Sequence, residues 1–564
     1  MVRPHLLRRA LATYAVGAVL GTLPLFLDWS LRSGAVNHRS LAGFSLLGGL
    51  VAGLSALLMV ALRGRSRWYE PTACVFACFL SLEVLYLINV GLLPNDGFLA
   101  SRSIVWDLVA FGPTIGGVWL AIRARDWLTS SVGTRILPLV GGVLLIGAAV
   151  VVAETWPVEP GIPRRQGDGP NLVVIVVDAA RRDHLGLYGY GRATSPSIDA
   201  WASRARVYDR ALAASSWTLD SVPVLLGSSS GDTGEHPVLN ELKARGYVVA
   251  CFSDNPLFER GGPLSRGFDH AGQSTGAAPR MLRTLFAETF IGEFVVMWPW
   301  LAMKWDDRRL VDEALRWADR AEGPFLLYVH LMDAHMPYRR PAIDGRGWRH
   351  RRLLSPTPGM STLPEEASDI VAHYDGGIRS ADDAAGRVLK AAEEWRRPYL
   401  AIVTSDHGES LGEGSRWGHG KTLAPELLDV PLLVVGDGVR PGRVDAPVGH
   451  ASVAETLLLA AGLPGAARRH ASDLRTGSGD VFVEGRLPPA MSYRVARGYQ
   501  AVMNSSTGEA RLFDLREDAR REHDVSRLHP SLLHELTAGL PGESPAPVDT
   551  GVLERLRALG YIDE

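Results

Sequence analysis

The chain has 564 residues, several times the usual domain size of about 100–150 residues, so we expect at least two domains. Its formal charge at pH 7 is −2 and 46% of its residues are hydrophobic, which argues against a nucleic-acid-binding protein and against a disordered chain. With only three cysteines, a disulfide-framed secreted domain is excluded.

Five apolar runs occupy the N-terminal part of the chain, near residues 11–31, 41–62, 73–93, 104–122 and 136–153. A helix needs about twenty apolar residues to cross the hydrocarbon core of a bilayer, so the runs predict five transmembrane helices in a membrane domain, 1–155. No small-residue cleavage site follows the first run, which favours a retained anchor over a removed signal peptide.

Basic residues predict the orientation of these spans. Arginines cluster before the first run and after the second and fourth, whereas the intervening loops hold only Arg32, Arg39 and Arg102. Because cytoplasmic loops carry the excess of Arg and Lys, the N-terminus is predicted to be cytoplasmic. An odd number of spans then places the chain from residue 156 onward outside the cytoplasm, in a multi-pass protein of the cell membrane.

The second half begins with a Pro/Gly/Arg-rich linker, 156–170, followed by a β-branched run at 171–177 that is typical of a buried parallel strand. Further runs at 247–252, 325–330, 399–404 and 431–435 alternate with helical patterns such as 378–395. This alternation predicts an α/β fold with a mostly parallel sheet sandwiched by helices. In such sheets the chemistry gathers at the carboxyl ends of the strands.

Three polar side chains follow two of these runs. Asp178 ends the first run, and Asp406 and His407 follow the run that ends at Thr404. Carboxylates beside an imidazole suit a divalent cation that takes mixed oxygen and nitrogen ligands. The imidazole favours Zn or Mn, with Ca or Mg as the alternatives.

Longer motifs carry a family resemblance. They are residues 171–190 (NLVVIVVDAARRDHLGLYGY), 194–199 (TSPSID), 328–338 (YVHLMDAHMPY), 404–412 (TSDHGESLG) and 417–421 (WGHGK). Over roughly 171–465 the chain resembles the sulfatase family of the alkaline phosphatase superfamily. A weaker similarity at 508–524 resembles the small antiparallel subdomain of that family. The resemblance implies an alkaline-phosphatase-like catalytic domain, 171–480, and a C-terminal subdomain with a tail helix, 481–564.

The resemblance also implies roles for individual residues. Asp178, Asp406 and His407 match the positions where the family holds its metal. His335, His419 and Lys421 match the positions that bind the anionic oxygens of the ester, and Lys421 is one of only four lysines in the chain. For His330, at a strand end, a place beside the metal ligands and a structural role are equally favoured.

The nucleophile position departs from common sulfatases. Those enzymes oxidise a Cys or Ser in a Cys/Ser-x-Pro-x-Arg motif to formylglycine, but here Thr218 stands at the nucleophile position, with Asp220 and Val222 in place of the proline and arginine. A threonine hydroxyl needs a metal to lower its pKa, so Thr218 is expected to be both nucleophile and metal ligand. Ala179 replaces a second acid, which indicates one metal ion rather than two.

The threonine, the single-metal ligand set and five predicted spans resemble membrane phosphoethanolamine transferases and lipoteichoic-acid synthases. Their first metal ligand is commonly glutamate rather than the Asp178 found here, and the cysteine pairs of many phosphoethanolamine transferases are absent. Sulfatase-like proteins of other kinds also carry a Ser-Trp-Thr-Leu motif. The subfamily therefore stays open at this point.

We hypothesise a membrane-anchored metalloenzyme that transfers or hydrolyses a phosphoryl group through Thr218, acting on a lipid or an envelope-glycan ester. One alternative is a sulfate-ester hydrolase that works without formylglycine, and another is an inactive sulfatase fold serving as a membrane scaffold. The segment 290–305 (FIGEFVVMWPWLAMKW) is too short to span a bilayer and rich in tryptophan, so it is either an interfacial segment or a core helix.

Overall fold

The computed structural model describes residues 162–540 apart from 231–233, 235, 260–261, 275–304, 346–363, 466–470, 478, 480–481 and 488–490. The five predicted spans, the tail beyond residue 540 and residues 290–304 of the tryptophan-rich segment lie outside this range. Among the residues that are described, none of the helices is long and apolar enough to cross a bilayer.

Nine strands form one sheet within the described part of the chain. Its order is β10-β2-β9-β6-β1-β5-β3-β4, with β11 also pairing with β2. The bounds are β1 Asn171–Val177, β2 Arg206–Leu212, β3 Val248–Ser253, β4 His270–Gly272, β5 Phe325–Leu331, β6 Tyr399–Thr404, β9 Asp429–Gly436, β10 Gly442–Val444 and β11 Val448–Gly449. The pairs among β1, β3, β4, β5 and β6 are parallel, whereas β9 runs antiparallel to both β6 and β2. The predicted mostly parallel α/β sheet is confirmed.

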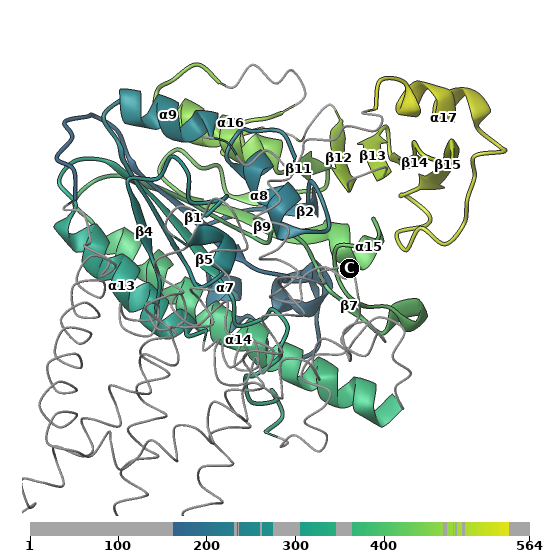
Figure 1. The fold of residues 1–564 in the computed structure, drawn as a ribbon, viewed down its shortest axis with the longest axis horizontal. Coiled ribbons are helices and arrows are strands. Elements are labelled where there is room, and N and C mark those ends of the chain that lie inside the picture. Colours follow the sequence, from purple (N-terminus) through teal and green to yellow (C-terminus); the bar gives the residue numbers. More distant parts are fainter. Residues whose placement is uncertain are drawn as a thin grey trace, which may run out of the picture. The chain divides into compact units, whose positions relative to one another are not determined.

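Helices cover both faces of this sheet (Figure 1). One layer contains α7 (Pro196–Trp201), α13 (Asp307–Arg320) and α14 (Pro364–Glu394), and the other contains α8 (Thr218–Leu225), α9 (Pro237–Ala244) and α16 (Ala451–Ala460). Short 3-10 turns at Arg182–His184, Gly186–Tyr188, Pro256–Phe258 and Glu413–Ser415 and the one-turn helix α15 (Pro425–Leu428) lie in the loops.

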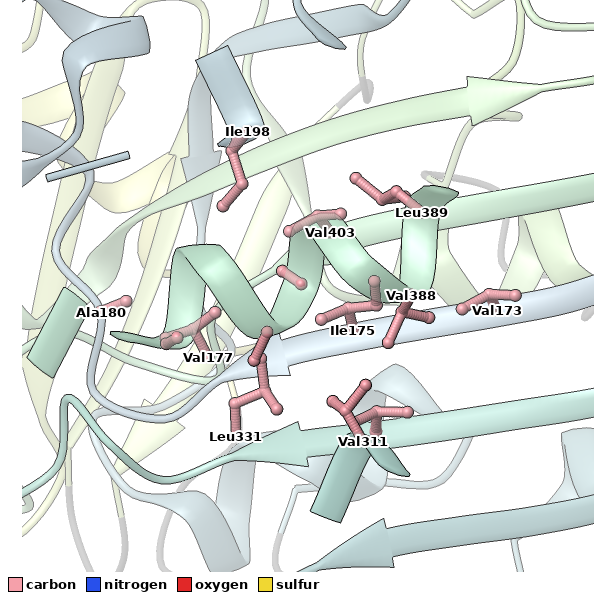
Figure 2. Close-up of a cluster of buried hydrophobic side chains, with 14 of the residues drawn as sticks. Val173, Ile175, Val177, Ala180, Ile198, Val311, Leu331, Val388, Leu389 and Val403 are labelled. Carbon is pink, nitrogen blue, oxygen red and sulfur yellow. The ribbon is translucent and has the colours of Figure 1, made fainter. Parts of the chain in front are cut away.

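The core forms because side chains alternate between the two faces of a strand. Val173 and Ile175 of β1 share one face and pack with Val388 and Leu389 of α14 (Figure 2). The whole of β1 is buried, as its continuous apolar run predicts for a central parallel strand. Burial of each such side chain contributes about 1.5–3 kcal/mol, which holds the strand ends rigidly for the polar residues that follow them.

A second, antiparallel sheet follows the nine-stranded sheet in the chain. It has the order β12-β13-β14-β15, with bounds Val483–Leu487, Met491–Ala496, Tyr499–Asn504 and Glu509–Asp514. Helix α17 (Pro530–Thr537) packs on it through Leu536, against Ala501 and Leu512. The small antiparallel C-terminal unit expected from the sequence is therefore present.

Strand β2 was not predicted. Its sequence, RVYDRAL, carries three charged residues, and no apolar run marks it. The strand lies between β10 and β9. Its register with the antiparallel β9 shifts between Tyr208 and Ala211, at the charged residues Asp209 and Arg210. It matters for the site because the chain continues from β2 directly into the loop that precedes Thr218.

Candidate metal centre and nucleophile

Two carboxylates meet at the carboxyl edge of the sheet. Asp178 follows β1 and Asp406 follows β6, and because these strands are parallel neighbours their ends lie side by side. Both side chains are fully buried. Oδ1 of Asp178 and Oδ2 of Asp406 have no hydrogen-bond partner among the described residues.

A tight turn after β1 holds these two acids together. Ala179 adopts a left-handed backbone with φ +59°, which is rare for a residue with a Cβ. The turn is tied down from two sides: the Ala179 amide donates to Oδ1 of Asp406 at 3.3 Å, and the Tyr374 hydroxyl donates to the Ala179 carbonyl at 2.8 Å. Ala179, which stands where the family commonly has a second acid, therefore forms the turn after β1.

Two imidazoles face the carboxylates. Nε2 of His407 lies 3.7 Å from Oδ1 of Asp178 and 3.5 Å from Oδ2 of Asp406. Nδ1 of His407 donates to the Gly408 carbonyl at 2.9 Å, which leaves the lone pair on Nε2. His330 instead places Nε2 2.9 Å from Oδ2 of Asp178 and 3.8 Å from Oδ2 of Asp406.

His330, for which the sequence left two roles open, lies beside the two acids. Its side chain is fully buried and contacts Asp178, so it belongs to the surroundings of the carboxylates. Asp178, His330 and Asp406 offer ligand atoms that all lie within 4.8 Å of one another. Asn255 completes the surroundings by donating from Nδ2 to the same Oδ2 of Asp178, at 3.1 Å.

Thr218 is the first residue of α8 and is 2% exposed. Its hydroxyl donates to Nε2 of His407 at 3.2 Å, so the loop after β2 brings it to a residue 189 positions away in the sequence. The loop is closed by Ser221, whose hydroxyl accepts from the Ser215 amide at 3.1 Å. Thr218 thus contacts His407, another of the metal ligands predicted from the sequence.

Two more histidines, His335 and His419, lie beside His407, and Nε2 of His335 is 4.0 Å from Oδ1 of Asp178. The ring centroids of His419 and His407 are 4.3 Å apart, and those of His419 and His335 are 5.0 Å apart. Nδ1 of His419 lies 2.9 Å from Oε1 of the buried Glu409. Burial opposes the charge of His419, but the Glu409 carboxylate outweighs it and raises the pKa of His419, whereas burial lowers the pKa of His335.

Lys421 lies two residues beyond His419 and is exposed. Its loop follows the hairpin of β7 (Ser410–Leu411) and β8 (Trp417–Gly418), which are antiparallel, so Glu409 and His419 lie side by side at the open end of the hairpin. Five of the seven residues named from the sequence, Asp178, Thr218, His335, Asp406 and His407, are buried, and His419 contacts them, whereas Lys421 is exposed.

Three residues at the site were not predicted: Asn255, Glu409 and Trp305. The ring of Trp305 packs edge-on against His335 at 5.3 Å. Glu409 was visible in the motif DHGE, and an acid so close to two histidines was a usable signal. Asn255 carried no such signal, because its role depends on β3 lying next to β5 in the sheet.

The donor set fits a divalent cation. Two buried carboxylates with unpartnered oxygens repel one another unless a positive charge neutralises them. Burial raises the pKa of Asp178, but the adjacent histidines His335 and His330 outweigh it and lower that pKa, so the group is a carboxylate at neutral pH. Oxygen and imidazole donors together are the chemistry of Zn and Mn sites.

Comparison with protein families decides the assignment. The family model described as Sulfatase matches residues 170–463, which is just over half of the chain. The chain belongs to the sulfatase family. Sulfatase-family enzymes use a divalent metal, and the cluster at Asp178 and Asp406 is the candidate site for it in this member. The match ends before the C-terminal antiparallel sheet begins.

Individual relatives refine the family assignment. Phosphoethanolamine transferase EptA of Helicobacter pylori is 23% identical over 381 residues, covering 63% of this chain and 67% of EptA. The low-salt glycan biosynthesis sulfotransferase Agl7 of Haloferax volcanii is 44% identical over 148 residues, covering 25% of this chain and 34% of Agl7. For the first curated relatives that it matches, the chain spans less than half of their length.

The fold is also found in solved structures. The structure of BT4656 in complex with its substrate D-glucosamine-2-N,6-O-disulfate aligns with a TM-score of 0.50 at 14% identity, covering 70% of this chain and 99% of BT4656. This likeness establishes the fold alone. The sulfatase family and the relatives named as transferases favour an enzyme, a hydrolase or transferase, over the inactive scaffold considered above.

Proposed function

We propose that this protein is a phosphoethanolamine-transferase-like enzyme that forms a covalent phosphoryl intermediate on Thr218. The observation that carries the proposal is the contact between the Thr218 hydroxyl and Nε2 of His407. That nitrogen faces Oδ1 of Asp178 and Oδ2 of Asp406, the two buried oxygens that have no hydrogen-bond partner among the described residues. A bound divalent ion would lower the pKa of that hydroxyl and neutralise charge on the ester. Asp178, Thr218, Asp406 and His407 would hold the ion.

The first half of the reaction is a displacement at phosphorus. Oγ1 of Thr218 forms a bond to the phosphorus of a phosphodiester, the bond from phosphorus to the leaving alcohol breaks, and the departing oxygen takes up a proton. In the second half an acceptor alcohol or water attacks the phosphorus, the bond to Oγ1 breaks and Thr218 regains its proton. His419, whose pKa is raised by Glu409, would donate to the ester oxygens, and the neighbouring His335 would help to bind them.

The substrate class follows from the family and the predicted anchor. We infer a lipid or envelope-glycan ester, because the relative EptA is named a phosphoethanolamine transferase and Agl7 a glycan biosynthesis sulfotransferase. The five predicted spans would hold the catalytic domain, 171–480, at the outer face of the membrane. The tryptophan-rich segment 290–305 would serve as an interfacial segment, and its last residue, Trp305, packs against His335.

Sulfate-ester chemistry is the second candidate. It is favoured by the sulfatase family match and by the name of Agl7, since sulfate and phosphate esters present the same tetrahedral, anionic oxygens. A threonine nucleophile tells against it. Sulfatases of the common kind rely on formylglycine, and neither Cys nor Ser occupies position 218.

Mass spectrometry of the peptide containing Thr218 separates the two candidates. The full-length protein is incubated with phosphatidylethanolamine vesicles, or with a nitrophenyl sulfate, quenched and digested. We expect a phosphoethanolamine adduct on Thr218 with the vesicles, and no adduct in Thr218→Ala. A sulfate adduct without any phosphoryl adduct would favour the second candidate, and an unmodified Thr218 during full turnover would reject the covalent mechanism.

A further inference from the structure

The site is built from two arms that are distant in sequence. One arm is the segment 214–221, which includes the start of α8 and carries Thr218. The other arm is the loop after β6, which carries Asp406 and His407. Only a 3.2 Å contact between Thr218 and His407 joins the functional side chains of the two arms directly. The separation of the arms must therefore be set by residues behind them.

His450 bridges these arms. Its Nε2 donates to the Ser405 carbonyl at 3.0 Å, next to Asp406. On the opposite edge of the ring, Nδ1 accepts from the Ala214 amide at 3.2 Å, and the Ser221 hydroxyl oxygen lies 3.4 Å from the same nitrogen. Each ring nitrogen thus contacts a different arm.

The surroundings of His450 are those of a fixed, neutral ring. The residue is 4% exposed and immediately precedes α16, whose first turns are buried against α8. Ser221 also donates to the Ser215 carbonyl at 3.2 Å, so the loop that His450 holds is itself closed. A neutral imidazole has one donor and one acceptor nitrogen. In His450 the donor Nε2 binds the Ser405 carbonyl and the acceptor Nδ1 binds the Ala214 amide.

We propose that His450 is a positioning residue that sets the distance between Thr218 and the Asp406–His407 arm. This inference rests on the proposed role of Thr218 as nucleophile. A neutral imidazole is a rigid spacer, and a misplacement of about 1 Å between a nucleophile and its activating group can cost about 100-fold in rate. His450 contacts neither substrate nor ligand atoms and acts through the backbone of Ala214 and Ser405.

The test compares two replacements of similar size. His450→Leu fills the space without hydrogen bonds, whereas His450→Gln keeps an amide N–H and a carbonyl oxygen. Turnover of a nitrophenyl phosphodiester is measured on the full-length protein and divided by the burst amplitude, so that only folded sites are counted. We expect His450→Leu to lower kcat about 10- to 100-fold with KM changed less than threefold, and His450→Gln to recover at least tenfold of that loss.

A matched control is His236→Leu. His236 is also a fully buried histidine that contacts a serine hydroxyl, Ser228, at 3.1 Å, and it precedes α9 rather than α16. It is expected to lower the thermal midpoint without lowering kcat per active site. A His450→Leu variant within twofold of wild type, or equal losses in His450→Leu and His450→Gln, would overturn the inference.

Two further measurements keep the outcome unambiguous. If His450→Leu does not fold, Ser221→Ala takes its place, because it deletes a single hydroxyl in contact with Nδ1; we expect at least a threefold loss of kcat, and an unchanged kcat overturns the inference. If Thr218→Ala keeps full turnover, the proposed function itself fails. If Thr218→Ala is inactive while His450→Leu is fully active, only the role of His450 fails.

Discussion

The hydroxyl of Thr218 lies 3.2 Å from Nε2 of His407, and that nitrogen lies 3.7 Å from Oδ1 of Asp178 and 3.5 Å from Oδ2 of Asp406. This relationship joins a helix N-terminus to a strand end that is 189 residues away in sequence. In the proposed mechanism, a cation bound to these acids would activate the Thr218 hydroxyl.

Replacement of Thr218 tests that relationship first. Thr218→Val keeps the shape of the side chain and removes its oxygen, so we expect turnover of a nitrophenyl phosphodiester to fall at least 1,000-fold, on the order of 4 kcal/mol in the barrier. Thr218→Ser keeps the hydroxyl and should retain measurable activity. Thr537→Val, at a partly buried position on α17, serves as the control. Comparable rates for Thr218→Val and wild type would rule out a direct nucleophile.

Loss of one carboxylate should release the metal. In Asp406→Asn we expect metal content, measured by elemental analysis, to fall at least tenfold and turnover to be lost. Chelated wild type should regain activity with Zn or Mn. Asp445→Asn removes an exposed acid paired with Arg210 and should change neither quantity. Full activity of the metal-depleted wild type would contradict the assignment.

The same variant also tests the repulsion between Asp178 and Asp406. Without metal, two buried carboxylates face one another, whereas Asp406→Asn leaves only one charge. We therefore expect metal-free Asp406→Asn to unfold at a higher temperature than metal-free wild type, and at a lower temperature than metal-loaded wild type. If metal-free wild type instead unfolds at the higher temperature, repulsion between the Asp178 and Asp406 carboxylates does not dominate the stability of the metal-free protein.

His330 is expected to support the ligands rather than replace one. Because Nε2 of His330 lies at hydrogen-bonding distance from Asp178, His330→Gln should weaken metal binding about 10- to 100-fold and leave some turnover at saturating metal. His407→Gln should be more severe. His184→Gln, which alters another buried histidine paired with Asp375 at 2.8 Å, is the matched control and should keep its metal. Equal losses in His330→Gln and His407→Gln would place His330 among the ligands.

His450 gives a pH dependence of stability whose sign can be worked out. Burial lowers the pKa of His450 to about 3, against about 6.5 in an unfolded chain. The unfolded chain therefore binds the extra proton first, so the contribution is fully present above pH 6.5 and is lost as the pH falls toward 3. The whole shift corresponds to roughly 3–5 kcal/mol.

The variant His450→Gln cannot take up that proton. Thermal midpoints measured from pH 7 down to pH 4 should fall less steeply for His450→Gln than for wild type. Parallel curves for the two proteins would mean that His450 stays accessible to protonation in the folded state.

The predicted orientation of the membrane domain is tested with reporters. A phosphatase reporter fused after Glu564 is active only outside the cytoplasm, and we expect it to be active because arginines flank the first, second and fourth apolar runs on the cytoplasmic side. A cytoplasm-only reporter at the same position is the control and should be inactive. The opposite pattern would reverse the topology.

Much of the fold and family could be predicted from local sequence. The buried run of β1 and the runs of β5 and β6 are apolar on both faces, a pattern that central parallel strands produce and that needs no neighbour to be recognised. Acids and histidines directly after such runs must collect at one edge of a parallel sheet. For that reason Asp178, Asp406 and His407 could be named together before any coordinates.

The tertiary structure decided what depends on separate segments meeting. Strand β2 is polar along much of its length and is a strand only because β9 and β10 supply its hydrogen bonds, so no local pattern reveals it. Asn255 reaches Asp178, and His450 spans Ala214 and Ser405, only because the order of strands brings these loops together. Sequence determines which chemical groups leave the strand ends; the packing of distant segments determines which of them touch, because hydrogen bonds and burial act over a few ångströms in space whatever the distance along the chain.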